Sequence, residues 1–95
     1  MNKHYETIFI LVPTLKEEET KANVEKFTNI ISSNGEVIKV DEWGKRKLAY
    51  EINKAAEGYY VYVEFNAEGD FVKELERNYK ISDSVMRYLV VKKEK

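Results

Sequence analysis

Apolar and polar positions change their spacing along the first third of the chain. Residues 5–12 are dense in β-branched and aromatic side chains and stop before Pro13, which predicts a strand. After a short polar segment, a second pattern recurs at intervals of four, three and four, which predicts one buried stripe of a helix. This stripe consists of Thr20, Val24, Phe27 and Ile31.

Both ends of this helix carry local signals. Thr14 and Glu17 have the spacing of a capping box, in which the hydroxyl and the carboxylate each accept a hydrogen bond from a backbone N–H. Asn34-Gly35 predicts the end of the helix, because glycine adopts the left-handed conformation without a side-chain clash.

The middle of the chain has the alternation of strands. Apolar residues occupy even positions in residues 36–52, interrupted near Gly44, which predicts one long strand with a bend or bulge at that glycine. Residues 55–58 are expected to form a turn. Residues 59–65, rich in tyrosine and valine, are predicted to form the third strand.

The last third predicts a second helix and a fourth strand. Asp70 is expected to cap the helix. Its buried face is predicted to consist of Val72, Leu75 and Tyr79. Residues 82–84 turn the chain, residues 85–91 form the last strand, and residues 92–95 are expected to be a frayed charged tail.

The predicted order is therefore β-α-β-β-α-β. Right-handed crossovers around a central hairpin make this an α+β, ferredoxin-like sandwich. Its four-stranded antiparallel sheet should have the order 4-1-3-2, with both helices on one face. Ninety-five residues suffice for one such domain, so residues 1–95 are expected to form a single unit.

Both faces of this sheet are predicted to be apolar, whereas one face of such a sheet usually meets water. We assign to the core a first set, Phe9, Leu11, Val61, Val63, Phe65 and Val90. The opposite set lies on the face that the helices do not cover, and consists of Ile8, Ile10, Tyr60, Tyr62, Leu89 and Val91. An exposed apolar area of this kind usually marks a binding surface. Strand ends and long tyrosine side chains covering part of that face within the monomer are the alternative.

The net charge of −1 hides an uneven distribution. The predicted helices carry slightly more carboxylates than cations. Residues 43–54 hold four cations against one carboxylate, and residues 85–95 have the same balance. A weakly acidic chain can therefore present a basic surface to a polyanion. The densest basic stretch is Lys45-Arg46-Lys47, which suits phosphate binding, although lysines also protect sheet edges from aggregation.

The segment Gly44-Lys45-Arg46-Lys47-Leu48-Ala49-Tyr50-Glu51-Ile52 resembles the motif of the bacterial small-subunit ribosomal protein six family. The opening strand from Tyr5-Glu6 to Pro13 and the closing residues 85–92 are similar to the same family. Two features depart from it. Lys47 stands where a broader polar choice is expected, and the chain lacks the longer tail of some relatives, so a role for that tail does not transfer.

This resemblance implies a ribosomal protein of ferredoxin-like fold, without enzymatic activity, that works in the cytoplasm. It implies binding to the central domain of the small-subunit rRNA, together with small-subunit ribosomal protein eighteen. We expect RNA contacts from Lys45, Arg46, Lys47, Arg87, Lys92, Lys93, Lys3 and His4. We expect the partner protein to contact Ile8, Ile10, Tyr60, Tyr62, Leu89 and Val91. The isolated chain is expected to be a monomer.

Other functions find less support in the residues. His4 is the single histidine, cysteine is absent, and the four glycines are isolated, so no catalytic, metal or phosphate-cradling motif is recognisable. We therefore expect no cofactor, metal ion or small-molecule substrate. A signal peptide and a membrane-spanning segment are not recognisable either. Two alternatives remain open, a single-strand RNA reader that stacks bases on its sheet and a homodimeric regulatory domain.

Overall fold

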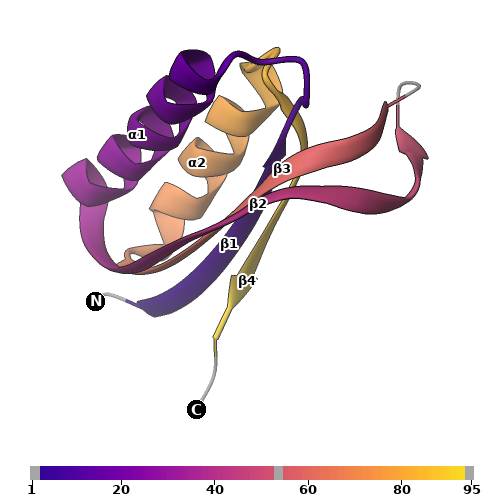
Figure 1. Cartoon of the computed structure of the whole chain (residues 1–95). Coiled ribbons are helices and arrows are strands. Elements are labelled where there is room, and N and C mark those ends of the chain that lie inside the picture. The colour runs from indigo at the N-terminus through magenta and orange to yellow at the C-terminus, as the bar shows by residue number, and fades with distance from the viewer. Residues whose placement is uncertain (1–2, 53–54, 94–95) are drawn as a thin grey trace.

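The computed structural model describes residues 3–52 and 55–93, with side chains except those of residues 48–52 and 55–56. Four antiparallel strands form one sheet in the order β2-β3-β1-β4, which confirms the predicted order. Figure 1 shows both helices on one face of that sheet and the β2–β3 hairpin projecting well beyond them. The elements are β1 (Lys3–Leu11), α1 (Glu17–Asn34), β2 (Gly35–Ile52), β3 (Ala55–Ala67), α2 (Gly69–Ile81) and β4 (Val85–Lys92).

The core lies between the helices and one face of the sheet. Every strand residue that we assigned to it is fully buried except Val90, which is partly buried and packs against it. At its centre the rings of Phe9, Phe27 and Tyr79 meet pairwise, with centroids 4.8–5.2 Å apart. Thr7 is the buried polar residue of this core. Its hydroxyl donates to the Leu89 carbonyl at 3.0 Å and lies 3.1 Å from the Tyr79 hydroxyl.

The ends of α1 differ from the prediction. The residue before the helix is Lys16, whose backbone N–H donates to the Glu19 carboxylate at 3.0 Å. The predicted capping box of Thr14 and Glu17 is therefore wrong, because the last glutamate of the acidic run, rather than the first, occupies the third helical position. Gly35 follows the helix with φ −172°, which is extended and not left-handed. A side chain there would clash with the Asn66 carbonyl of β3, so close strand approach requires this glycine.

The start and the buried face of α2 also differ from the prediction. The residue before the helix is Glu68, and no side chain caps it, so Asp70 lies in the first turn instead of capping the helix. The buried residues are Phe71, Leu75 and Tyr79, whereas Val72 is only partly buried. Phe71 takes the predicted place of Val72 because its ring packs edge-on against Phe65, with 6.2 Å between centroids.

The β2–β3 hairpin is longer than predicted. Residues 55–58 belong to β3 and do not form a turn: Glu57 pairs with Lys47, and Gly58 pairs with Arg46. Gly58 is a close-packing position, because a side chain there would clash with Ile10. The predicted bulge at Gly44 is confirmed by a register shift between Glu42 and Gly44, and by φ +81° at Gly44.

The last strand reaches into the segment that we expected to fray. Lys92 is paired with Tyr5, and the backbone N–H of Lys93 donates to the His4 carbonyl at 2.8 Å. The strand continues because the backbone of Tyr5 and His4, at the start of β1, lies alongside it and pairs with it. The remainder of the expected tail, residues 94–95, lies outside the described residues.

Candidate RNA and protein interface

The sheet face away from the helices is called the open face, and its rows follow from the strand register. One row runs across Tyr62, Ile8 and Leu89. The next row, toward the arm, runs across Gly44, Tyr60, Ile10 and Arg87. These two rows bring together five of the six residues that we expected to contact a partner protein, and the sixth, Val91, lies opposite Glu6 in the row beyond Leu89.

The residues expected to contact a partner protein differ in exposure, and those on β4 are the most exposed of the six. Leu89 is 54% exposed and Val91 is 45% exposed, while Ile8, Tyr60 and Tyr62 are partly buried. Ile10 is only 8% exposed, so its predicted availability for contact is wrong. It packs over the space left by Gly58, which lacks a side chain. A hollow of about 310 Å³ lies beside it, lined by Ile8, Ile10, Arg87, Tyr88 and Leu89.

An aromatic stack covers the β2 side of the open face. The bulge before Gly44 places Trp43 on the same side as the two tyrosines of β3. The indole lies nearly parallel to both phenol rings, at 7° and 5.9 Å for Tyr62 and at 18° and 6.3 Å for Tyr60. The guanidinium of Arg46 lies 5.4 Å from the centre of the indole, within cation–π range. Trp43 was not among the predicted contact residues; its position beside the bulge glycine was the available signal.

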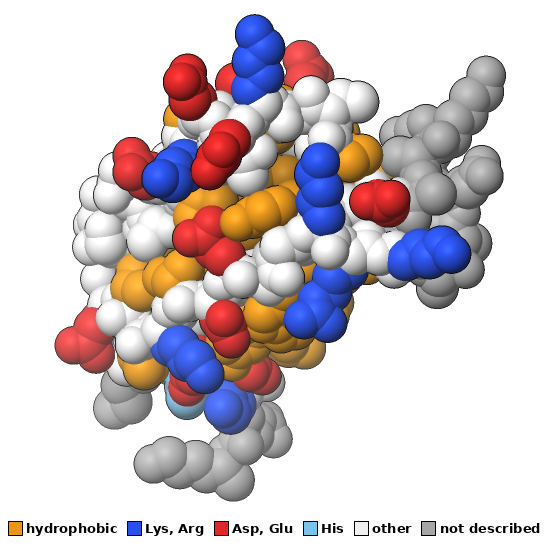
Figure 2. All heavy atoms as spheres, viewed as in Figure 1, with side chains coloured by type: hydrophobic (Ala, Val, Ile, Leu, Met, Phe, Trp, Pro, Cys, Tyr) orange, Lys and Arg blue, Asp and Glu red, His pale blue; other side chains and the backbone are white. Residues whose placement is uncertain are grey.

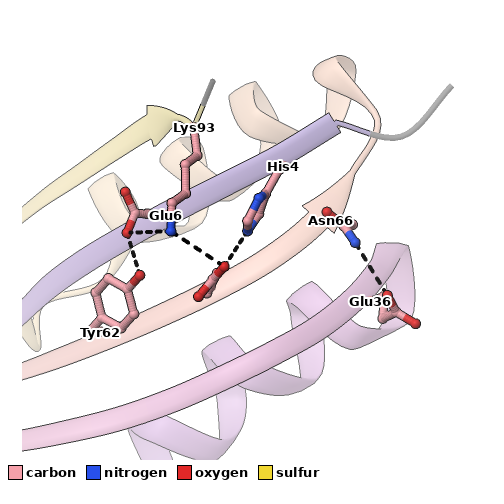
Figure 3. Close-up of polar contacts among 7 residues, drawn as sticks. His4, Glu6, Glu36, Tyr62, Asn66 and Lys93 are labelled. Atoms are coloured by element: carbon pink, nitrogen blue, oxygen red, sulfur yellow. Dashed lines mark hydrogen bonds and ion pairs between the residues drawn. The ribbon is translucent and has the colours of Figure 1, made fainter. Parts of the chain in front are cut away.

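A polar cluster closes the open face at the other end of the strands (Figure 3). Glu6 and Glu64 are directly opposite each other on β1 and β3. Their repulsion is offset by Lys93, whose ammonium lies 4.0 Å and 3.7 Å from the two carboxylates. His4 adds a contact, with its Nε2 atom 2.5 Å from Glu64. Two of the predicted RNA-binding residues are therefore already engaged with carboxylates.

Tyr62 links this cluster to the aromatic stack. Its hydroxyl donates a hydrogen bond to the Glu6 carboxylate. That bond, then burial and then the negative charges of Glu6, Glu64 and Asp41, raise the pKa of Tyr62 to about 12. The phenol therefore stays neutral over the physiological range and holds its ring in the plane on which Trp43 rests.

The basic triplet lies where β2 leaves the sheet. The arm, defined as residues 46–52 and 55–58, pairs only with itself, because the pairing of β1 with β3 ends at Leu11. Lys45, Arg46 and Lys47 are all exposed, and among the described side chains none of them forms an ion pair. Figure 2 shows basic side chains around the root of the arm.

Strand alternation divides this triplet between two faces. Arg46 points to the open face, where it meets Trp43. Lys45 lies on the helix side, in a hollow of about 340 Å³ whose lining includes Glu17, Glu42 and Tyr59. The Tyr59 hydroxyl donates to Glu42 at 2.7 Å. Burial, followed by this hydrogen bond and nearby carboxylate charge, raises the pKa of Tyr59 to about 12.

The predicted RNA-binding residues do not form one continuous patch. Lys45, Arg46 and Lys47 lie at the arm, and Arg87 shares the row of Tyr60 and Ile10. The others, Lys3, His4, Lys92 and Lys93, lie at the opposite end of β1. At roughly 3.3 Å per strand residue, the length of β1 separates the two groups by about 26 Å.

Within the described ranges, no group of three or more histidine, aspartate or glutamate side chains is arranged to hold a metal ion. No helix of the described part of the chain is long and apolar enough to cross a membrane.

Comparison with known proteins decides the family. The sequence profile of ribosomal protein S6 matches residues 4–92. The chain belongs to the ribosomal protein S6 family. Small ribosomal subunit protein bS6 of Clostridium kluyveri is 59% identical over 92 residues, covering 96% of this chain and 97% of that protein. The same protein of Thermoanaerobacter pseudethanolicus is 54% identical over 91 residues, covering 95% and 96%.

A solved structure agrees with this assignment. The crystal structure of 30S ribosomal protein S6 from Thermotoga maritima superposes with a TM-score of 0.93 at 35% identity, covering 98% of this chain and 89% of that chain. The ferredoxin-like fold and the family resemblance predicted from the sequence are thereby confirmed.

Membership of the S6 family fixes the general function. The protein is a structural component of the bacterial small ribosomal subunit, where it associates with rRNA, and it is not an enzyme. Its place of action is the ribosome, in agreement with the predicted cytoplasmic location. The family matches favour the ribosomal interpretation over the single-strand reader and the regulatory domain.

Proposed function

We propose that the chain binds the central domain of the small-subunit rRNA together with small-subunit ribosomal protein eighteen. Two parts of its surface divide this work. The open face receives the protein, and the basic residues around the arm bind RNA phosphates. The observation that carries the proposal is that one sheet exposes Leu89 and Val91 on the open face of β4, while its opposite edge, β2, continues into the basic arm.

The protein contact is proposed to center on β4. Leu89 and Val91 expose roughly half of their surface, and water contact with such residues is unfavourable. Ile8, Tyr60 and Tyr62 extend the contact across the sheet as partly buried residues. Ile10 supports this surface from beneath, because it is buried.

The RNA contact is proposed to center on Lys45, Arg46, Lys47 and Arg87. Lysine supplies a point charge to phosphate, and arginine supplies a planar fork that suits phosphate or a base edge. Lys3, His4, Lys92 and Lys93 form a second, weaker contact at the far end of β1. The second contact is weaker because Glu6 and Glu64 offset the charge of Lys93, and Glu64 also contacts His4.

The RNA contact is tested with two triple variants of matched composition. Changing Lys45, Arg46 and Lys47 to alanine should weaken binding to a central-domain rRNA fragment. It should also lower the salt slope by roughly one unit per lost phosphate contact. Changing Lys73, Arg77 and Lys80, which are two lysines and one arginine exposed on α2, should have little effect. Equal loss in both variants would contradict the proposed position of the RNA.

The protein contact is tested with a second matched pair. Leu89→Asp should abolish association with protein eighteen and leave the fold intact, because the position is 54% exposed. Ile81→Asp changes an equally apolar residue, 69% exposed at the end of α2, and should leave association unchanged. Isothermal titration of each folded variant with the purified partner measures the difference. Unchanged affinity of the Leu89 variant would remove the open face from the interface.

A further inference from the structure

We propose that Trp43 is a stacking platform for one unpaired base of the small-subunit rRNA, over which the Arg46 guanidinium closes. The inference rests on the proposed function and adds to it the chemistry of one contact. In it, a nucleobase rather than a phosphate meets the protein, at the β2 side of the open face and beside the protein contact that centers on β4.

The local backbone presents the indole as a fixed flat surface. Trp43 is the extra residue of the bulge, and Gly44 beside it leaves the space opposite Tyr60 without a side chain. Two phenol rings lie under the indole at 5.9 Å and 6.3 Å, almost parallel to it. Tyr62 is itself anchored by its hydrogen bond to Glu6. A base that stacks here meets a ring whose orientation is already set, so little conformational entropy is lost.

The outer face of the indole is accessible. Trp43 is 37% exposed although it contacts two other aromatic rings. Among the described side chains, Arg46 covers this face of the ring, with its guanidinium carbon 5.4 Å from the ring centre. Arg46 is exposed and pairs with Gly58, which offers no side chain across the strands. The guanidinium can therefore move aside and stack on the other face of an inserted base, as planar arginines do with RNA bases.

Charge favours RNA over an apolar protein segment as the occupant. Arg46 lies on the same face as Trp43. Its neighbours Lys45 and Lys47 project from the other face of the edge strand β2, so an RNA strand that brings a base to Trp43 brings its phosphates to an edge that carries three cations. The apolar residues that suit a protein, Leu89 and Val91, lie on β4. Two strands separate β4 from β2, which is about 14 Å at the usual strand spacing.

The sole tryptophan of the chain provides a direct measurement. The complex with protein eighteen is titrated with a central-domain rRNA fragment while indole fluorescence is followed, and the Trp43→Phe complex serves as the blank. RNA should quench the Trp43 signal beyond any change that protein eighteen alone produces through Tyr60 and Tyr62. A signal that changes on adding the protein and does not change further with RNA would place Trp43 in the protein interface and overturn the inference.

The RNA affinities of variants, measured at several salt concentrations, distinguish a stacking contact from a charge contact. Trp43→Leu should weaken RNA binding about tenfold, the usual effect of losing one stacked base, with an unchanged salt slope. Trp43→Phe should lose less, because a smaller ring remains. Arg46→Lys, which keeps the charge but not the plane, should weaken binding without changing the slope. Wild-type affinity in Trp43→Leu, with no quenching in the native protein, would overturn the inference and leave the proposed function intact. Failure of the native complex to bind the fragment would overturn both.

Discussion

The two faces of the sheet are built from neighbouring residues of the same strands, but their side chains differ in burial. In β1, Phe9 and Leu11 are fully buried beneath the helices, whereas Ile8 between Thr7 and Phe9 is only partly buried on the open face. Both faces are apolar, so hydrophobicity does not distinguish them. The difference is that α1 and α2 supply Phe27, Leu75 and Tyr79 to one face. On the other face, a few side chains of the sheet itself give partial cover.

The covered face therefore provides most of the stability, and the open face remains available for the proposed association. The covered face is closed by aromatic rings in mutual contact. The open face keeps Leu89 and Val91 exposed and ends in a charged cluster on one side and a basic arm on the other. Substitutions on the two faces should therefore affect different measurements.

The sharpest contrast comes from adjacent residues. Phe9→Ala should lower the free energy of unfolding by about 3–5 kcal/mol, because it removes a fully buried ring and leaves a cavity. Ile8→Ala, one residue away on the open face, should cost only about 1 kcal/mol. Urea denaturation of both variants measures the difference. Similar losses would mean that both faces contribute equally to the core.

The buried hydroxyl of Thr7 gives the next largest effect. Thr7→Val should cost about 1–3 kcal/mol, because the Tyr79 hydroxyl loses its partner in the buried core. Burial also raises the pKa of the Tyr79 phenol, so the phenol stays protonated and ionisation does not compensate for the lost hydrogen bond. Thr28→Val is the control, since the Thr28 hydroxyl bonds to the Val24 carbonyl on partly exposed α1. A smaller loss for Thr7→Val than for the control would contradict this account.

The bulge that supports the open face is tested at Gly44. Gly44→Ala should cost about 1–2 kcal/mol, because φ of +81° is unfavourable for a residue with a side chain. Space is not the reason, since no atom lies within 4 Å of an added Cβ. Gly69→Ala, at the first residue of α2 where an added Cβ makes ordinary contact, should be nearly neutral. Thermal unfolding compares the two, and equal melting temperatures would mean that the bulge is not strained.

The smallest effect is a pH dependence at Tyr62. The folded protein raises the pKa of this phenol to about 12, above the value of 10.0 for a free tyrosine. The folded state therefore holds the proton more tightly than the unfolded chain. The resulting stability is complete below pH 10 and is lost as pH rises toward 12. Urea midpoints should fall less steeply over this range in Tyr62→Phe than in the native protein, and parallel slopes would contradict the assignment.

Much of the fold is predictable from local pattern. The stripe of Val24, Phe27 and Ile31, the bulge at Gly44 and the strand order all follow from spacing and from connection rules. Errors occur where a tertiary contact competes with a local signal. Gly58 suggested a turn, but it is a place where Ile10 packs against a strand. Val72 was predicted to be buried instead of Phe71, because the ring against which Phe71 packs, Phe65, belongs to another element.

The candidate site was predictable as a set of residues and not as an arrangement. Alternation along the strands identified the open face, and the register then aligned Tyr62, Ile8 and Leu89. The alternation gave no indication that the Ile10 side chain is buried or that the Trp43 ring stacks on two tyrosines. These features depend on which residues meet across strands that are far apart in sequence.

The elements, their order and the two apolar sides of the sheet follow from the sequence alone, because periodicity is a property of neighbouring residues. The exposure of individual apolar residues, the division of the basic residues into two groups and the rings beneath Trp43 follow only from the folded arrangement. Burial and stacking depend on groups that folding brings together from distant parts of the chain. A helix covers one face of the sheet, and a glycine opposite a large side chain determines how closely two strands pack.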